Sequence, residues 1–168
     1  MDIDIRTLQK SDIPGITAAF TGSEWRIAPS FFEEFLKEQD MGKRVVLLAY
    51  ADGVFAGYVT IKWDSDYPPF AAQDIPEIND LRVLRSFRRC GIATALVDEA
   101  EKRIFKRSTV VGIGVGMYAD YGPAQRMYVR RGYVPDGLGL YYKDQPVVPG
   151  HEVCVDDDLN LYFIKERE

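Results

Sequence analysis

Apolar and polar positions along this 168-residue chain change period several times, and each change marks an expected element. Ile3 and Ile5 alternate with charged residues, which predicts a short strand with one buried face. Longer apolar runs predict further strands at residues 45–49, 54–63, 77–84, 109–116, 133–142 and 158–164. Helical spacing predicts helices at residues 11–20, 30–41 and 122–132, and a longer one that begins between Arg88 and Ala93.

Turn chemistry sharpens several of these boundaries. Ala51-Asp52-Gly53 is typical of a hairpin between two strands, and Ser30 to Glu33 has the spacing of a capping box. Residues 64–76 contain three prolines, which predicts a loop that exposes Tyr67 and Phe70.

Residues 81–106 organise the rest of the chain, because they pass from strand to turn to helix. An apolar stripe at helical spacing comprises Ala93, Leu96, Val97, Ala100 and Ile104. We expect two i,i+4 ion pairs on the solvent-exposed face of this helix: Asp98 with Lys102, and Glu99 with Arg103.

The turn before that helix has the composition of a phosphate site. Arg82, Arg85, Arg88 and Arg89 lie within eight residues that contain no acid, and Gly91 lets the backbone approach a ligand closely. A helix that begins here presents free N–H groups and the positive end of its dipole to an anion. A solvated basic edge before an amphipathic helix is the alternative for the charges alone.

Composition limits the function classes. The length predicts one domain over residues 1–168. The net charge of −5 argues against general nucleic-acid binding, and no apolar run approaches the roughly 20 residues of a membrane span. The acidic N-terminus does not resemble a signal peptide, so we expect a cytoplasmic protein. Cys90 and Cys154 are too few for a disulfide framework or a metal site, so no metal is expected.

The hexapeptide Arg88-Arg89-Cys90-Gly91-Ile92-Ala93 matches the Arg/Gln-x-x-Gly-x-Gly/Ala signature of the GNAT superfamily, and the chain resembles these N-acetyltransferases. The expected element order, β-α-α-β-β-β-α-β-α-β-β, is similar to that of the family over nearly the whole length. The resemblance implies an α+β, three-layer acyl-CoA N-acyltransferase fold, with a mixed twisted central sheet flanked by helices. It also implies acetyl-CoA as cosubstrate.

In the family this turn holds the donor pyrophosphate through main-chain amides, and the central strand pairs with the pantetheine arm. Carried over by position, the implied donor-binding residues are Leu81, Arg82, Val83, Arg88, Arg89, Cys90, Gly91, Ile92, Ala93, Thr94, Tyr121 and Ala124. Cys90 could be a reactive thiol near a helix N-terminus, but we interpret it as a residue with no specific role at a position that does not require cysteine.

Transfer to an amine requires removal of a proton, because an alkyl ammonium has a pKa near about 10. Glu77, which opens the central strand, is the candidate base; some family members use a glutamate there, often through water. A surface carboxylate at a strand end is the alternative. Asp80 is a second candidate, but strict alternation would place it on the opposite face from Glu77. His151 lies in the expected loop at residues 143–157, and the simpler interpretation is an exposed residue with no catalytic role.

Tyr128 is the candidate general acid. Residues 121–133 resemble the family segment Asn-x-x-Ala-x-x-Leu-Tyr-x-x-x-Gly-Phe, whose tyrosine faces the coenzyme sulfur. A buried core tyrosine is the alternative. Tyr121 departs from the usual asparagine, which leaves Asp120 as a possible helix cap.

Three functional hypotheses remain at this point. The first is direct acetyl transfer to a primary amine, of a small molecule or a peptide, within a ternary complex. The second is a non-catalytic acyl-CoA sensor or assembly subunit. The third, a nicotinamide enzyme built on Gly112, Gly114 and Gly116, is weak because the spacing misses the dinucleotide fingerprint; these glycines are expected to let their strand separate from its neighbour. Loop position suggests acceptor contacts from Trp25, Tyr67, Phe70 and Tyr118, and family analogy suggests a homodimer.

Overall fold

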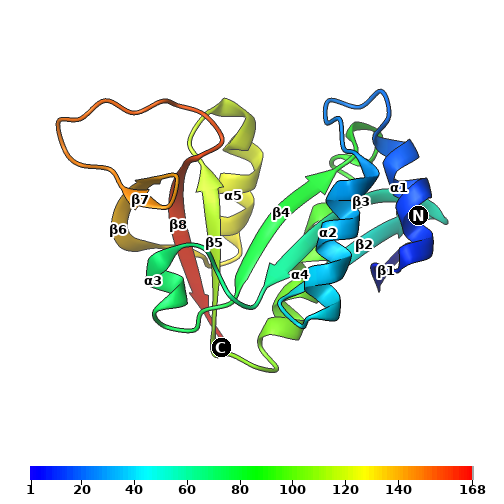
Figure 1. The fold of residues 1–168 in the computed structure, drawn as a ribbon, viewed down its shortest axis with the longest axis horizontal. Helices are drawn as coiled ribbons and strands as arrows, with labels where there is room; N and C mark the ends of the chain where they lie inside the picture. The colour runs from blue at the N-terminus through cyan, green and yellow to red at the C-terminus, as the bar shows by residue number, and fades with distance from the viewer. Residues whose placement is uncertain (168) are drawn as a thin grey trace.

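The computed structural model describes residues 1–167, which build one mixed eight-stranded sheet (Figure 1). Its strands are β1 (Ile3–Thr7), β2 (Arg44–Ala51), β3 (Val54–Lys62), β4 (Glu77–Val83), β5 (Val110–Gly116), β6 (Val134–Tyr142), β7 (Gln145–Pro146) and β8 (Leu159–Glu166). They lie in the order β1-β2-β3-β4-β5-β8-β6-β7. Only β4 and β5 are parallel to each other; every other neighbouring pair is antiparallel.

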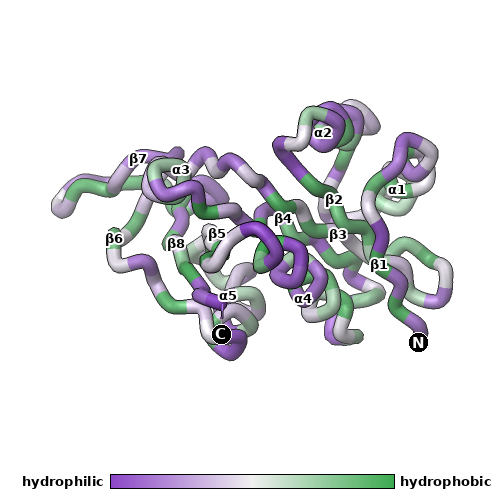
Figure 2. Tube along the Cα trace, turned by 90° about the horizontal axis from the view of Figure 1, so that it is seen from below, coloured by the Kyte–Doolittle hydropathy of each residue, from purple (hydrophilic) through white to green (hydrophobic). Residues whose placement is uncertain are grey.

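The helices cover both faces of the sheet, so the predicted three-layer α+β architecture is confirmed. They are α1 (Ile13–Phe20), α2 (Pro29–Asp40), α3 (Pro68–Ala71), α4 (Ile92–Ile104) and α5 (Gly122–Arg130). Figure 2 shows α1, α2 and α3 on one side of the sheet, with α4 and α5 on the other. Short 3₁₀ turns at Lys10–Asp12, Arg85–Phe87 and Ala119–Tyr121 precede α1, α4 and α5.

The largest core lies under α4, where the predicted stripe is confirmed. Leu96, Val97, Ala100 and Ile104 are fully buried against the sheet, and Ala93 is half-buried. Complete burial of each large apolar side chain stabilises the fold by about 1.5–3 kcal/mol. On the solvent-exposed face, Arg103 binds Glu99 as expected, whereas Asp98 pairs with Arg131 rather than with Lys102.

A second core joins α1 and α2 to the opposite face of the sheet. Phe20, Phe32 and Tyr58 are fully buried there, with their rings packed edge-to-face or stacked. The predicted capping box at Ser30 is wrong, because α2 begins one residue earlier, at Pro29, and no side chain caps it. Proline suits the first helical position, since the N–H that it lacks would have no partner in the helix.

The prediction that Tyr67 and Phe70 are exposed is also wrong. Both side chains are 1% exposed, and with Tyr162 they form a third cluster beneath α3. The Tyr67 ring stacks on Tyr162 with a centroid separation of 3.5 Å. The predicted loop over residues 64–76 is also interrupted by a helix, because Pro68 and Pro69 form the first turn of α3.

β4 and β5 separate soon after they meet. Only two residue pairs are in register, Glu77 with Gly112 and Ile78 with Ile113, and both strands then diverge towards their carboxyl ends (Figure 1). The predicted separation of the strands is confirmed, but the glycines of β5 have another role. A Cβ at Gly112, Gly114 or Gly116 would lie 2.2–2.8 Å from the ring of Phe70, Tyr162 or Tyr121 respectively, so these glycines make room for aromatic side chains.

Candidate active site

The turn between β4 and α4 is shaped by two residues in the left-handed region. Arg89 has a φ of 62° and Gly91, which precedes the first residue of α4, has a φ of 83°. The helix begins at Ile92, within the predicted interval. Its first internal hydrogen bond runs from the Ala95 N–H to the Gly91 carbonyl, so the N–H groups of residues 92–94 have no helical acceptor. Left-handed turn residues followed by free helical N–H groups form a site suited to an anion.

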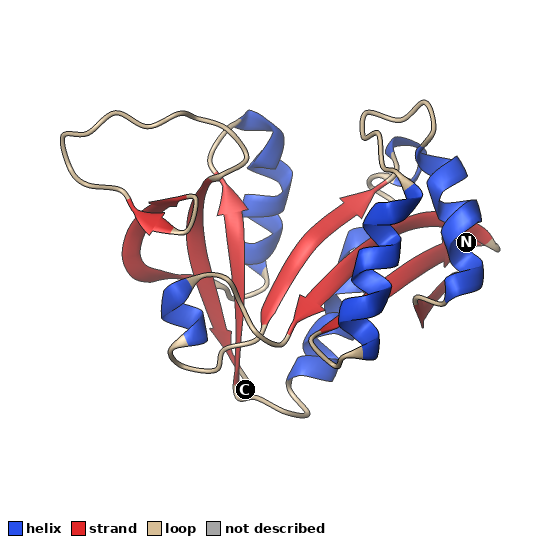
Figure 3. Ribbon diagram, viewed as in Figure 1, coloured by secondary structure: helices blue, strands red, loops and turns tan. Residues whose placement is uncertain are grey.

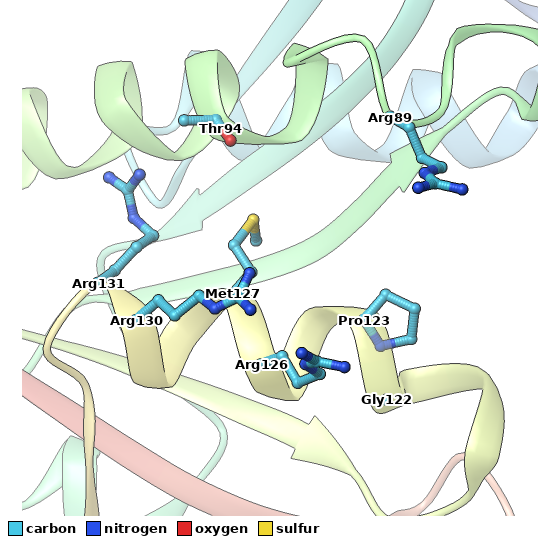
Figure 4. A pocket seen from close by; sticks show the side chains of 8 residues that line it. All are labelled: Arg89, Thr94, Gly122, Pro123, Arg126, Met127, Arg130 and Arg131. Atoms are coloured by element: carbon cyan, nitrogen blue, oxygen red, sulfur yellow. The ribbon is translucent and has the colours of Figure 1, made fainter.

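A cleft of about 740 Å³ lies beside this turn, between the start of α4 and the outer face of α5 (Figure 4). The residues that line it are Arg89, Thr94, Gly122, Pro123, Arg126, Met127, Arg130 and Arg131. Arg131 is ion-paired with Asp98 and Glu101, so the guanidinium groups of Arg89, Arg126 and Arg130 supply the positive potential of the cleft, on a chain of net charge −5. The sequence analysis missed Arg126 and Arg130, although their i,i+4 spacing on a helix was a readable signal.

The same turn is tied to the loop between α1 and α2. Arg88 forms an ion pair with Glu24, and the Trp25 ring lies near two guanidinium groups, 5.3 Å from Arg88 and 5.7 Å from Arg82. Cys90 is exposed in the turn, with its Sγ 3.5 Å from the Arg88 carbonyl oxygen.

A bulge in β4 changes which side chains share a face. The pairing of β3 with β4 shifts between Tyr58 and Thr60, and Asp80 adopts a φ of 51°. Asp80 accepts hydrogen bonds from the Tyr58 hydroxyl at 2.6 Å and from Arg82 Nε at 2.7 Å, on the α1–α2 side of the sheet. The prediction that Asp80 lies opposite Glu77 is therefore wrong, since strict alternation does not continue through a bulge.

Beyond the bulge, Leu81 and Val83 pack into the α4 core, and Arg82 points to the other face. The side chains of Leu81, Arg82 and Val83, which the family pattern implies for donor binding, therefore lie on both faces of the sheet. Their backbone lies beyond the last β4–β5 residue pair, on the edge of β4 that is not paired with β5.

Glu77 lies at the point where β4 and β5 are still paired, and its side chain is buried. Ser65 Oγ donates a hydrogen bond to Glu77 Oε2 at 2.5 Å, and Asn79 Nδ2 donates to Oε1 at 3.3 Å. Burial raises the pKa of Glu77, while the Ser65 hydrogen bond, the Lys62 charge and the Asn79 amide offset part of that rise. A carboxyl group whose pKa is raised, at the point where two parallel strands begin to diverge, is a stronger proton acceptor than an exposed glutamate.

Tyr128 is almost completely buried in α5, packed edge-to-face against Tyr133 with ring centroids 5.6 Å apart. Burial raises the pKa of the phenol, and no hydrogen bond contributes to that shift. Because no fully enclosed side-chain oxygen or nitrogen within residues 1–167 lacks a partner, the Tyr128 hydroxyl oxygen is open at its tip. A hydroxyl group that is open at its tip and has no hydrogen bond contributing to its pKa is available to a ligand atom.

Tyr121 and Tyr118 share one acceptor at the carboxyl end of β5. Both hydroxyl groups donate to Asp157 Oδ1, which lowers the pKa of that carboxyl group. The Tyr121 ring packs over Gly116. Asp120 does not cap α5, because Tyr121 is the capping residue and no side chain bonds to the free N–H groups. Ala124 is half-buried against the α4 core.

The other residues that the sequence suggested do not join this site. His151 is exposed in the loop between β7 and β8 (Figure 3), and Tyr67 and Phe70 support α3. Two polar residues that sequence reasoning missed do belong to it: Ser65 and Asn79, both bonded to Glu77. The structure, as far as residue 167, contains no helix long and apolar enough to cross a membrane, and no cluster of three metal-ligating side chains.

Comparison with known proteins agrees with this geometry. Solved structures with the same fold include an N-acetyltransferase from Staphylococcus aureus Mu50 (15% identity, TM-score 0.71, 99% of each chain covered). A ribosomal-protein-alanine N-acetyltransferase from Brucella melitensis is similar at 17% identity and a TM-score of 0.69, over 97% of this chain and 99% of that one. PaiA N-acetyltransferase from Thermoplasma acidophilum, solved in complex with coenzyme A, aligns at 15% identity and a TM-score of 0.62, over 99% of both chains.

At these identities the structural matches establish the fold, and the sequence itself decides the family. No curated protein sequence matches the chain. The model of the acetyltransferase (GNAT) family, however, matches residues 11–133, which include the β4–α4 turn and Tyr128. The chain belongs to the GNAT family of acetyltransferases.

Proposed function

We propose that this protein transfers an acetyl group from acetyl-CoA to a primary amine by direct attack within a ternary complex. The observation that carries the proposal is the arginine-lined cleft beside the free N–H groups of α4, next to the edge of β4 from which β5 diverges. The family membership and the coenzyme A complex of the PaiA relative support the same donor.

The residues present fit the phosphates of such a donor. The amides of Ile92, Ala93 and Thr94 would hold the pyrophosphate, and each charge-assisted hydrogen bond contributes about 1.5–3 kcal/mol net. Arg126 and Arg130 would face the remaining negative charge across the cleft. β4 residues beyond Ile78 have no partner on the β5 side, so their backbone groups can pair with an extended arm and polarise a carbonyl group there.

When bound, the thioester supplies the acetyl group; the chain supplies proton transfer and orientation. Glu77 would accept the proton of the acceptor ammonium, through a water molecule because its side chain is 6% exposed. Tyr128 would donate a hydrogen bond to the departing thiolate. Because burial raises the pKa of the phenol above that of a thiol, this hydrogen bond can be its whole role, with the thiolate then protonated from solvent. Asp80 is unsuited to the role of base, because the Tyr58 hydroxyl and Arg82 already occupy its carboxylate.

The donor site is tested by a substitution in the turn. In Gly91→Glu a side chain is forced into the left-handed region and a negative charge is placed at the phosphate position. We expect acetyl-CoA to bind at least tenfold more weakly by calorimetry, since one charge-assisted hydrogen bond contributes about 1.5–3 kcal/mol. Gly42→Glu is the matched control, because Gly42 also has a positive φ (72°) and open space, after α2. Equal affinity in the two variants would contradict the proposed donor site.

Catalysis is tested by release of the coenzyme A thiol in the presence of a panel of primary amines and peptides. Tyr128→Phe should lower kcat by roughly 10²-fold, the range for loss of an acid–base group, without weakening acetyl-CoA binding. Unchanged turnover would remove Tyr128 from the mechanism. Tight donor binding with no turnover of any amine would favour a non-catalytic acyl-CoA sensor instead.

A further inference from the structure

The surroundings of Glu77 form a chain of directed hydrogen bonds that reaches across three strands. Arg44, on β2, is 5% exposed, and its Nη1 donates to Thr60 Oγ1 at 2.7 Å and to Asn79 Oδ1 at 3.4 Å. Asn79 Nδ2 in turn donates to Glu77 Oε1. The chain is held at its far end by an ion pair between Arg44 and Glu38 and by the Phe35 ring, 4.2 Å from the guanidinium carbon.

The direction of this chain follows from the chemistry of its members. A guanidinium group only donates hydrogen bonds, so the amide oxygen of Asn79 must face Arg44 and its NH₂ group must face Glu77. A flipped amide would place NH₂ against Arg44 and an oxygen against a carboxylate, which leaves two unfavourable contacts in a buried region. Arg44 therefore fixes Glu77 Oε1 as an acceptor.

The other carboxylate oxygen, Glu77 Oε2, is bonded to Ser65, whose hydroxyl group can either donate or accept the hydrogen bond. Ser65 Oγ accepts a hydrogen bond from the Tyr67 N–H at 3.1 Å, which leaves its hydroxyl proton free to point at Glu77 Oε2. A hydroxyl group has two acceptor lone pairs, so Ser65 can also rotate and accept a hydrogen bond from a protonated Oε2. The amide NH₂ that faces Oε1 cannot do this.

We propose that Asn79, fixed by Arg44, and Ser65 are positioning residues for Glu77, so that the proton taken from the acceptor resides on Oε2 and not on Oε1. This inference rests on the proposed role of Glu77 as base. The N–H bond of the acceptor breaks as its proton passes to the intervening water molecule, which gives one of its own protons to Oε2. An O–H bond forms there, and this proton leaves to solvent between turnovers. Both positioning residues act through the Glu77 carboxylate, which they contact directly, and neither is assigned a contact with the acceptor amine or the donor.

Other charged and titratable groups near Glu77 complete its electrostatic surroundings. These groups are Lys62 on β3, Asp66 in the following loop, Arg44 on β2 and Tyr162 on β8. Lys62 is already paired with Asp66, so Ser65 and Asn79 are the groups that contact the carboxylate directly. Removal of either donor takes away a hydrogen bond to the ionised form, which should raise the pKa of Glu77 further.

The test is a titration of the Glu77 carboxyl carbon by NMR in ¹³C-labelled protein, with its signal identified by its absence in Glu77→Gln. Ser65→Ala and Asn79→Ala should each shift the midpoint upward, and each should lower kcat roughly tenfold, in line with loss of one hydrogen bond to a charged group. The KM for acetyl-CoA should stay within twofold. Ser65→Thr, which keeps the hydroxyl, should restore both values, and Glu101→Gln, a buried carboxyl group elsewhere in the core, should leave the Glu77 midpoint unchanged.

The outcomes separate this inference from the proposed function. An unchanged Glu77 midpoint in both Ser65→Ala and Asn79→Ala would overturn the positioning roles, even where Glu77→Gln abolishes turnover. Wild-type turnover in Glu77→Gln would overturn the role of Glu77 as base, and this inference with it. If Ser65→Ala does not fold, Asn79→Ala and Ser65→Thr still decide the question, and the NMR titration needs no identified acceptor.

Discussion

Two buried carboxylates, Glu77 on β4 and Glu101 on α4, have almost the same exposure but opposite surroundings. Glu77 is 6% exposed and receives hydrogen bonds from two neutral groups, the Ser65 hydroxyl and the Asn79 amide. Glu101 is 7% exposed and is contacted by two cations, Arg131 and Lys165. Burial alone would raise the pKa of both.

The partners decide the outcome. At Glu77 burial prevails and the pKa rises, whereas at Glu101 the hydrogen bonds from Arg131 and Lys165 outweigh burial and the pKa falls. A carboxylate held by neutral donors can take up a proton, and one held by cations stays ionised and joins elements. Glu101 links α4 to the end of α5 and, through Tyr133 and Lys165, to β6 and β8. The comparison teaches that burial alone does not set the direction in which the pKa of a carboxyl group shifts; the charge of its partners does.

The largest expected effect comes from a substitution of Glu77 itself, which tests the difference between the two carboxylates most directly. Glu77→Gln keeps the shape and removes the proton acceptor, so kcat should fall by roughly 10²-fold or more, the range for loss of a general base. The free energy of unfolding at pH 8 should not fall, because the amide avoids the cost of burying a charge. Thiol-release assays and urea unfolding measure the two quantities, and a loss of stability equal to that of Glu101→Gln would contradict the distinction.

The corresponding change at Glu101 should have the reverse pattern. Glu101→Gln leaves Lys165 without its anion and Arg131 with only the exposed Asp98, so the free energy of unfolding should fall by about 3 kcal/mol, as for one partner of a buried pair. At saturating acetyl-CoA, kcat should remain within twofold of the wild type. A large fall in kcat in protein that is still fully folded would place Glu101 in the mechanism.

Much of this arrangement could be predicted from the sequence, because it depends on local spacing. The stripe under α4, the turn that ends at Gly91 and the Tyr128 segment are all read from neighbours within a few residues, and the structure places them as expected. Glu77 could be named as a candidate from its place at the start of β4.

What could not be predicted depends on contacts between distant segments. Ser65 lies twelve residues from Glu77 in a proline-rich loop, and nothing in its neighbours indicates that it reaches the carboxylate. The bulge at Asp80 reverses a face without any change in the alternating pattern, and Tyr67 is buried by Tyr162, almost a hundred residues away. The partners of both buried carboxylates come from distant segments, so the direction of each pKa shift follows only from the structure.

A milder substitution tests the same difference by removing one of the two cations that contact Glu101, so that its surroundings come closer to those of Glu77. Lys165→Met removes one of the two cations while its methylenes still cover the Tyr133 ring. Because Lys165 is partly exposed, the free energy of unfolding should fall by only about 1 kcal/mol. The pKa of Glu101, followed by ¹³C NMR, should rise, and an unchanged pKa would show that Arg131 alone holds the carboxylate ionised.

The smallest effect is also the most specific, because the two carboxylates should give opposite slopes of stability against pH. An unfolded glutamate has a pKa of about 4.3. Above that value, and up to its own raised pKa, folded Glu77 binds more protons than the unfolded chain, so its contribution to stability declines as pH rises through this window. Below about 4.3, down to its lowered pKa, folded Glu101 binds fewer protons than the unfolded chain, so its contribution is lost as pH falls.

Urea unfolding of the two glutamine variants from pH 3.5 to 8 therefore separates them. Relative to the wild type, Glu77→Gln should gain stability as pH rises above the unfolded value, while the deficit of Glu101→Gln should shrink towards acid pH. Parallel curves for the two variants would mean that their partners do not set the two pKa values in opposite directions. The sign of the slope thus reports the partners of each carboxylate without any assumption about the acceptor.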